Sequence, residues 1–318
     1  MTLSACLRSM RLRTLPLSLS GVVLGVCIAF SSVLVVEKSM SLLGDSDLSA
    51  VQAVHPIATV VFLLLTTVLL QILSNLSNEL GDTLSGTDRE DRQGVHYSLQ
   101  DGGLTIPEMK RLIASVAAAC CLSGLAMVYC SFGEIFAWMP ILLLLLGAAA
   151  IWAAMHYMLG KNPYGYRGLG DVFVFIFVGL VSVAGGYFVC AHTLPALLLL
   201  PASAIGFFSV GVLNVNNIRD MRSDVATRVT VAIKLGEHRA RIYQTVLVAI
   251  GWACMIIFMG MSSFPWPRWL FLLTLPLYVL HLKGVWTRTE RALDPMLPLL
   301  VLSTFFFSLL AGLGLVAA

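Results

Sequence analysis

Charged side chains are scarce in this sequence. Only 12% of its 318 residues are Asp, Glu, Lys or Arg, whereas 58% are hydrophobic. Soluble globular domains contain about a quarter charged residues and about half apolar residues. The mean hydropathy of +0.89 points the same way. This composition excludes a soluble enzyme, a disordered chain and a secreted disulfide-rich scaffold, and it indicates a polytopic helical membrane protein.

The sequence also lacks the cysteine patterns that are typical of disulfide-rich and metal-binding proteins. The seven cysteines include no Cys-x-x-Cys pair, and six of them lie within or at the edge of apolar stretches. Neither a disulfide framework nor a cysteine metal site is indicated by this pattern. We expect these cysteines to serve as small apolar packing residues.

Nine apolar stretches are long enough to cross a membrane, because a bilayer core of about 30 Å requires about 20 helical residues. The runs are continuous, unlike the alternating segments of membrane β-barrels. Since lipid offers no partners to backbone amides, such runs must be helical. We therefore expect an all-α polytopic membrane protein with a single domain over residues 1–318. The predicted spans are 15–36, 57–80, 113–132, 137–158, 172–191, 195–218, 242–261, 268–285 and 296–317.

The basic residues predict the topology. Eighteen of the twenty Lys and Arg residues lie on alternate connections, counted from the N-terminus, and only Lys38 and Arg268 lie on the others. Basic residues are retained on the cytoplasmic side, so the N-terminus is predicted to be cytoplasmic and the C-terminus to lie outside. The net charge of +3 reflects this topology and does not indicate nucleic-acid binding. The outer connection 37–56 is expected to be an ordinary solvated loop.

Two connections on the predicted cytoplasmic side, 81–112 and 219–241, are rich in acidic residues. With Glu79 at the edge of the first, they contain ten of the seventeen carboxylates. A loop that served topology alone would need only basic residues. These carboxylates therefore mark candidate functional positions.

The two acidic regions share a pattern. Asn78 and Asp82 are four residues apart, as are Asn216 and Asp220. Residues with this spacing lie on one helix face. An offset of 138 residues relates the first pair to the second, which suggests two similar halves, each with an acidic helix end (78–91 and 214–224).

The acidic helix ends predict a cation site. Gln71 and Asn75 continue the face of Asn78 and Asp82 into the membrane, so this stripe should face the bundle interior or a water-filled cavity. Hydrogen bonds between helices would explain the amides, but carboxylates that converge from two halves repel one another unless a cation is bound. Oxygen ligands without His or Cys suit Mg²⁺, which shares its ligands with phosphate-bearing substrates. The residues thus predict a site for a lipid diphosphate at the cytoplasmic mouth of the bundle.

These motifs resemble those of the UbiA superfamily of intramembrane prenyltransferases. Four further segments resemble the branch of that superfamily that acts on 1,4-dihydroxy-2-naphthoate, namely 71–78, 86–92, 164–170 and 214–220. The likeness covers nearly the whole chain. The motifs that carry it are Asn78-x-x-x-Asp82, Asp220-x-x-x-Asp224 and Tyr157-x-x-x-Lys161.

The resemblance implies nine transmembrane helices around a central cavity, in a bacterial cytoplasmic membrane. It also implies Mg²⁺-dependent transfer of a polyprenyl chain from its diphosphate to 1,4-dihydroxy-2-naphthoate, with decarboxylation to demethylmenaquinone. The implied metal ligands are Asn78, Asp82, Asp220 and Asp224. The implied substrate-binding residues are Asn78, Asp88, Lys161, Arg219, Asn216 and Asn217. The implied catalytic residues are Asp82, Asp220, Asp224, Lys161 and Tyr157, with Tyr157 near the reacting carbon. In one departure from the family pattern, Glu79 stands where the family usually has Asp.

The sequence leaves two alternative functions open. A related enzyme of the same superfamily could use another aromatic acceptor, such as 4-hydroxybenzoate. A cation-coupled transporter would also contain intramembrane carboxylates and repeated halves. Transporter sites lie near the bilayer midplane on broken helices, whereas these acids lie at predicted helix ends. The position of the acids therefore favours the enzyme.

Overall fold

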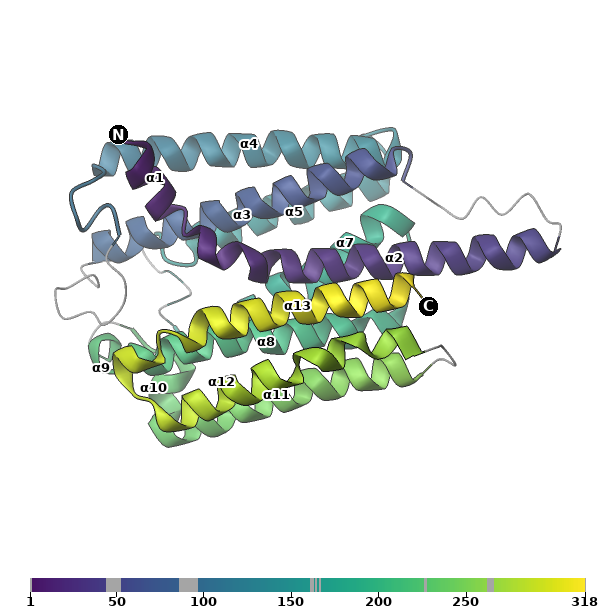
Figure 1. The fold of residues 1–318 in the computed structure, drawn as a ribbon. Coiled ribbons are helices and arrows are strands. Elements are labelled where there is room, and N and C mark those ends of the chain that lie inside the picture. Colours follow the sequence, from purple (N-terminus) through teal and green to yellow (C-terminus); the bar gives the residue numbers. More distant parts are fainter. Residues whose placement is uncertain are drawn as a thin grey trace.

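The computed structural model describes residues 2–43, 53–85, 97–160, 163, 165, 167–225, 228–261 and 266–317, with the backbone alone for 32–43. Within these ranges the regular structure is helical, apart from one isolated bridge between Arg167 and Val229. The helices run roughly along one common direction and form a bundle (Figure 1). This arrangement satisfies the backbone of long apolar segments without water.

The N-terminal part of the bundle contains four long helices. In this part, α3 packs against α4 and α5, and α2 packs against α3 and also against the C-terminal helices α7 and α13. The elements are α1 (Leu3–Ser9), η1 (Leu12–Thr14), α2 (Leu15–Leu43), α3 (Pro56–Ser85), α4 (Ile106–Phe132) and α5 (Trp138–His156).

The C-terminal part contains more broken helices. Its first span consists of α6 (Gly170–Val174), the π-helical η3 (Phe175–Val181) and α7 (Ser182–Ala191). Within η3, a Cβ atom at Gly179 would lie 2.4 Å from Cα of Gly206, so these two glycines let η3 and α8 touch. The remaining elements are η4 (Ala196–Leu198), α8 (Leu199–Arg219), α9 (Met221–Asp224), α10 (Val231–Leu235), α11 (Glu237–Gly260), η5 (Trp266–Thr274), α12 (Leu275–Thr287), η6 (Glu290–Leu293) and α13 (Met296–Val316).

The predicted spans are confirmed as membrane-crossing candidates. Among the described residues, nine helical stretches are long and apolar enough to cross a membrane, and they overlap the nine predicted stretches. The two chain ends lie at opposite ends of the bundle (Figure 1), as an odd number of crossings requires. The expectation of a loop over 37–56 was wrong in part, because α2 continues to Leu43 and no Gly or Pro interrupts residues 26–43.

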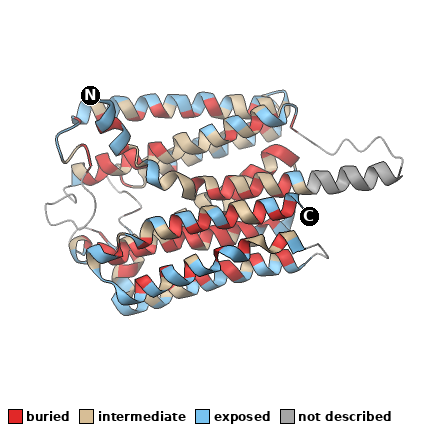
Figure 2. Cartoon of the chain, in the orientation of Figure 1, coloured by how far each residue is buried: buried red, intermediate tan, exposed pale blue. Residues whose placement is uncertain are grey.

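The core of the bundle lies around α8 and α13. In the most apolar stretch of each of these spans 56% of the residues are buried, against 11% in α5, so α5 lies at the periphery. Figure 2 shows the same concentration of buried residues. The centre is filled by aromatic side chains in edge and tilted contacts, which such rings prefer. These are Phe208, Trp252, Phe271, Tyr278 and Phe307.

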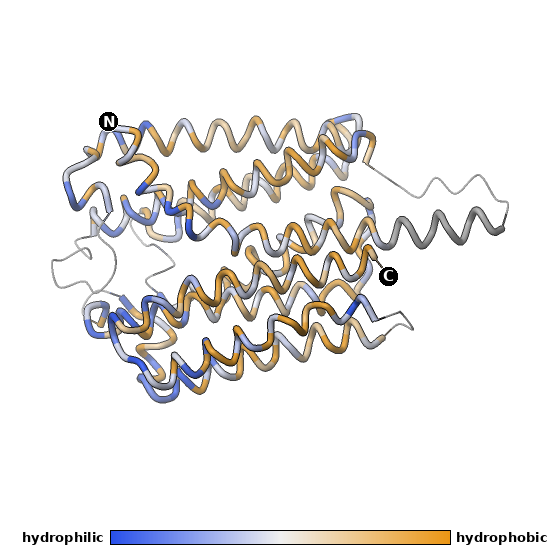
Figure 3. The backbone as a smooth tube through the Cα atoms, viewed as in Figure 1, coloured by the Kyte–Doolittle hydropathy of each residue, from blue (hydrophilic) through white to orange (hydrophobic). Residues whose placement is uncertain are grey.

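Hydrophilic residues are concentrated at one end of the bundle. Figure 3 shows them around α1, the C-terminal ends of α3 and α8, and the short helices α9 and α10. The helices between the two ends are mainly apolar (Figure 3). Both acidic motifs therefore lie at the same end of the molecule. The membrane orientation, the central cavity and the similarity of the two halves stay predictions.

Candidate functional site

The amide stripe of α3 faces the bundle interior, as predicted. Gln71 Nε2 donates to Asn75 Oδ1 (3.1 Å) and to the hydroxyl of Thr14 in η1 (3.3 Å). Asn75 Nδ2 donates to the carbonyl oxygen of Met10 (2.9 Å) and to Thr14 Oγ1 (3.0 Å). These bonds fix the N-terminal segment against α3. The two amides therefore act as interhelical hydrogen-bonding groups.

The last turns of α3 form the first acidic helix end. Glu79 and Asp82 are buried, with exposed fractions of 0% and 2%. Glu79 Oε1 accepts a hydrogen bond from the backbone N–H of Leu99 (2.9 Å). Asn78 Oδ1 is buried and has no hydrogen-bond partner among the described residues. Such an orphaned acceptor is uncommon in a protein interior.

A close contact places Tyr157 beside this helix end. A Cβ atom at Gly81 would lie 2.4 Å from the carbonyl oxygen of Met158, so only glycine lets α3 approach the end of α5 this closely. Tyr157 precedes Met158, and its own carbonyl oxygen accepts from the N–H of Gly165 (2.9 Å). Its hydroxyl lies against Gly170, where a Cβ would be 2.8 Å away. Gly165 and Gly170 thus make room for the tyrosine.

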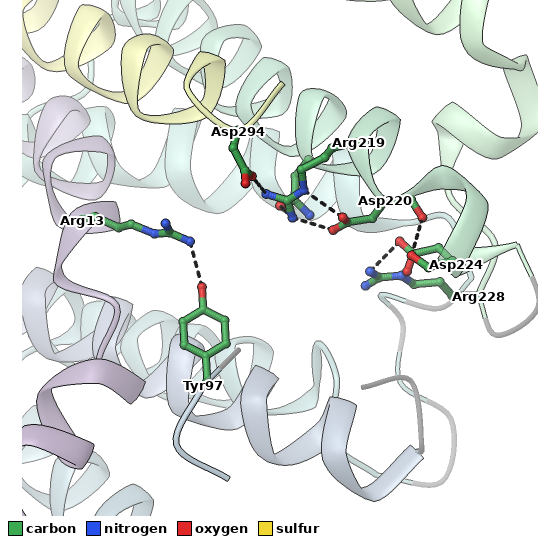
Figure 4. Close-up of polar contacts among 9 residues, drawn as sticks. Arg13, Tyr97, Arg219, Asp220, Asp224, Arg228 and Asp294 are labelled. Atoms are coloured by element: carbon green, nitrogen blue, oxygen red, sulfur yellow. Dashed lines mark hydrogen bonds and ion pairs between the residues drawn. The ribbon is translucent and has the colours of Figure 1, made fainter. Parts of the chain in front are cut away.

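The second acidic helix end is held by arginine. Arg219 ends α8, and its Nε and Nη2 donate to the two carboxylate oxygens of Asp220 at 2.8 and 2.6 Å. Nη2 also donates to Asn216 Oδ1 (2.9 Å), and Nη1 donates to Asp294 Oδ1 (2.7 Å). Figure 4 shows these contacts at the end of α8. The bidentate geometry is the strongest way to pair a carboxylate with an arginine.

Asp224 is paired in the same way, one helical turn further on. Its Oδ2 lies 2.6 Å from Nη2 of Arg228, and both side chains are buried. The backbone of Asp224 donates to the carbonyl of Asp220 (2.9 Å), which keeps both acids on one turn, as their spacing predicted. The bridge between Arg167 and Val229 then connects this segment to the glycine-rich turn beside Tyr157. A chain of contacts therefore joins the two acidic helix ends.

The neighbouring asparagines differ in their roles. Asn214 Nδ2 donates to the carbonyl of Ala240 (3.0 Å) and to Gln244 Oε1 (2.9 Å), which ties α8 to α11. Asn217 is buried, and Asn216 is half-buried and bound to Arg219. On the opposite side of the view in Figure 4, Arg13 Nη2 donates to the hydroxyl of Tyr97 (2.9 Å). The guanidinium of Arg11 lies 3.7 Å over the ring of Tyr97.

The donors at these two helix ends fit a hard divalent cation. They are carboxylate and amide oxygens, which Mg²⁺ prefers, and Asn78 Oδ1 is a buried acceptor without a partner in the described part of the chain. Among the described residues no three His, Cys, Asp or Glu side chains are grouped so that they could hold a metal ion by themselves. At the second end the buried carboxylates of Asp220 and Asp224 are balanced by arginines instead. A bound cation would share these carboxylates with Arg219 and Arg228.

Residues 41–316 match the model of the UbiA prenyltransferase family. The chain belongs to this family. It is 37% identical to the 1,4-dihydroxy-2-naphthoate octaprenyltransferase of Escherichia coli (strain K12), over 98% of this chain and 94% of that protein. It is 35% identical to the protein of the same name from Haemophilus influenzae, over 80% of this chain and 83% of that protein.

The fold of this UbiA family member is similar to that of a solved relative. The structure of a UbiA homolog from Archaeoglobus fulgidus bound to GPP and Mg²⁺ superimposes with a TM-score of 0.63 and 15% identity, over 99% of this chain and 100% of that one. At this identity the likeness concerns the fold alone. Membership of an enzyme family identifies the chain as a prenyltransferase and disfavours the transporter alternative.

Two predicted site residues of this prenyltransferase, Asp88 and Lys161, lie outside the described residues. Sequence reasoning also missed two residues that contact the second acidic end. Arg228 is four residues after Asp224, and this spacing is a signal that could have been used. Asp294 is 75 residues from Arg219, and no local pattern connects them.

Proposed function

We propose that this chain transfers a polyprenyl group from an allylic diphosphate to 1,4-dihydroxy-2-naphthoate, giving the quinol form of demethylmenaquinone for menaquinone biosynthesis. The main support is the presence of two buried acidic helix ends at one end of a UbiA-family bundle. The choice of acceptor rests on relatives named for that substrate, which are 35% and 37% identical to this chain.

In the proposed reaction, the prenyl group replaces the carboxylate on the naphthalene ring. The allylic C–O bond breaks and diphosphate leaves with the bonding electron pair. The ring carbon that carries the carboxylate forms a C–C bond to the prenyl carbon. The carboxylate then leaves as CO₂, and its bonding electrons restore the aromatic ring. No separate base is needed for rearomatisation.

The two acidic ends are proposed to hold the diphosphate with Mg²⁺. Asn78, Asp82, Asp220 and Asp224 would be the ligands, and the orphaned Asn78 Oδ1 is the observation that supports this assignment. When bound, Mg²⁺ would offset the negative charge that develops on the departing diphosphate.

The residues around these ligands would bind and orient the substrates. Asp88, Asn216 and Asn217 would complete the binding site, and Lys161 and Arg219 would contact the diphosphate. Tyr157 would line the pocket near the reacting carbon, where an electron-rich ring stabilises positive charge. Its neighbour Met158 packs on Gly81, one residue from Asp82, which is consistent with this role. The burial of the acidic ends would help to keep water from the allylic cation.

We further propose that the protein lies in the bacterial cytoplasmic membrane with its acidic ends and N-terminus on the cytoplasmic side. The distribution of Lys and Arg supports this orientation. The helices would surround a central cavity for the prenyl chain. The domain would comprise two similar halves, related by the offset of 138 residues between Asp82 and Asp220.

The test uses purified protein with Mg²⁺, a long-chain allylic diphosphate and a varied aromatic acceptor. Mass spectrometry would follow the prenylated product and CO₂. We expect both with 1,4-dihydroxy-2-naphthoate, loss of both with EDTA, and recovery with excess Mg²⁺. Product with 4-hydroxybenzoate alone would change the acceptor but keep the prenyl transfer. A folded protein that forms no product with any acceptor would contradict the proposed function.

A further inference from the structure

The connection between α12 and α13 reaches the second acidic helix end. Asp294, in this connection, accepts a hydrogen bond from Nη1 of Arg219 at 2.7 Å (Figure 4). Arg219 is 5% exposed and Asp294 is 40% exposed. The pair therefore links a buried arginine to a carboxylate that is partly in contact with solvent.

Every nitrogen of the Arg219 guanidinium is engaged. Nε and Nη2 hold Asp220, Nη2 also bonds Asn216, and Nη1 bonds Asp294. One positive charge is thus divided between two carboxylates. Because a guanidinium cannot neutralise two carboxylates, the group of Arg219, Asp220 and Asp294 keeps a net negative charge.

The position of Asp294 is fixed by its neighbours in the chain. Leu293 is completely buried, and Met296 packs so closely on α12 that a Cβ at Gly284 would lie 1.9 Å from its Sδ. The carbonyl oxygen of Met296 is also 3.0 Å from Nδ1 of the buried His281. These anchors hold the carboxylate of Asp294 in front of Arg219 rather than leaving it on a loose loop.

The same region is fixed to α8 by a buried polar network. His281 Nε2 lies 3.0 Å from Gln244 Nε2, and Gln244 Oε1 accepts from Asn214, five residues before Arg219. The network therefore joins α8, α11, α12 and α13. It sets the register between Arg219 and Asp294.

We propose that Asp294 is a positioning residue that draws the charge of Arg219 away from Asp220 and thereby keeps Asp220 able to bind a divalent cation. This inference rests on the proposed Mg²⁺-diphosphate site. Without Asp294, the whole guanidinium charge would act on Asp220. The cation would then compete against a stronger internal ion pair and would lose one nearby negative charge.

The test compares substitutions in the same connection. Asp294→Asn keeps the shape and an acceptor oxygen but removes the charge. Asp294→Glu restores the charge and should rescue. Glu290→Gln is the matched control, because it removes an equal charge from a residue that pairs with the exposed Arg222 instead of Arg219. Asp294 is partly exposed, so Asp294→Asn should fold.

The first readout is Mn²⁺ binding to the purified proteins, followed by electron paramagnetic resonance. We expect Asp294→Asn to raise the Mn²⁺ concentration for half-saturation roughly fivefold, given a partly solvated charge close to the site. Asp294→Glu and Glu290→Gln should stay within about twofold of wild type. The second readout is turnover against Mg²⁺ concentration, where saturating Mg²⁺ should restore Asp294→Asn. A purely structural role would instead lower turnover at every Mg²⁺ concentration.

The outcomes separate the two proposals. Wild-type protein that binds Mn²⁺ and turns over, with Asp294→Asn indistinguishable from Glu290→Gln, would overturn the role of Asp294 alone. Tighter Mn²⁺ binding by Asp294→Asn would overturn it as well. Wild-type protein that binds no Mn²⁺ would contradict the metal site, and with it both proposals.

Discussion

The ends of α3 and α8 carry similar residues at the same spacing, and the described contacts at the two ends reach different parts of the chain. At the end of α8, Asp220 and Asp224 are paired with Arg219 and Arg228 from the same short segment. At the end of α3, Glu79 instead accepts from the backbone of Leu99, in the connection to α4. The first end thus contacts the segment before α4, and the second end carries two arginines that pair with its own carboxylates.

This difference affects what each end requires. Buried carboxylates must be paired or hydrogen-bonded, because an isolated buried charge is costly. The arginines of the second end satisfy this requirement locally. At the first end, Asn78 Oδ1 is a buried acceptor without a hydrogen-bond partner among the described residues.

The largest expected effect is on turnover, and it should be the same at both ends. Asp82→Ala and Asp220→Ala should each lower turnover by more than about 100-fold, because each removes a proposed metal ligand. Membrane insertion should be unchanged, since neither residue lies in the middle of a span. Turnover would be measured by mass spectrometry on equal amounts of membrane-inserted protein. Wild-type turnover by either variant would refute its assignment as a ligand.

Substitutions at the two ends should differ in how much they lower the stability of the protein. Arg228→Gln leaves the buried carboxylate of Asp224 without its arginine, and breaking a buried pair in this way costs about 3–5 kcal/mol. The melting temperature in detergent should fall, and the double variant Arg228→Leu with Asp224→Leu should recover much of the loss. An unchanged melting temperature for Arg228→Gln would show that the local ion pair does not hold this end.

A smaller effect is expected at Glu79. Glu79→Ala removes the acceptor for the N–H of Leu99 and should cost about 1–3 kcal/mol, the usual penalty for an unpaired buried group. Hydrogen exchange at Leu99 should become faster. Glu79→Gln keeps an acceptor oxygen and serves as the control. Equal exchange at Leu99 in both variants and wild type would mean that this bond does not order the connection.

The smallest effects should come from the two asparagines. Asn216→Ala removes an acceptor of Arg219 and should cost about 1 kcal/mol. Asn78→Ala removes an oxygen without a partner, so its metal-free stability should stay within about 0.5 kcal/mol of wild type. Mg²⁺-dependent stabilisation should nevertheless be weaker in Asn78→Ala. A large loss of metal-free stability in Asn78→Ala would show that Asn78 stabilises the fold more than Asn216 does.

The spans were predictable from the sequence because bilayer thickness sets the length of an apolar helix. The amide stripe of α3 was predictable too, since helical spacing places Gln71 and Asn75 on one face and polar groups avoid lipid. The contact between Asp294 and Arg219 was not, because it depends on how α13 packs against α8. The end of α2 was misplaced because the two charged residues Glu37 and Lys38 suggested a loop, although residues 26–43 contain no Gly or Pro to end the helix.

The helix α2 is longer than its apolar part needs to be to cross a bilayer. At about 1.5 Å per residue, its 29 residues extend about 43 Å, whereas the 21 residues of α8 and of α13 extend about 32 Å. The shorter helices match a hydrocarbon core of about 30 Å, and α2 projects past its neighbours at the end opposite the acidic motifs (Figure 1). The apolar part of α2, residues 15–36, is about 33 Å long at the same rise and also matches the hydrocarbon core, and the charged residues Glu37 and Lys38 begin the part that extends beyond it. The last part of α2 would therefore extend the helix beyond the hydrocarbon core at the end opposite the acidic motifs.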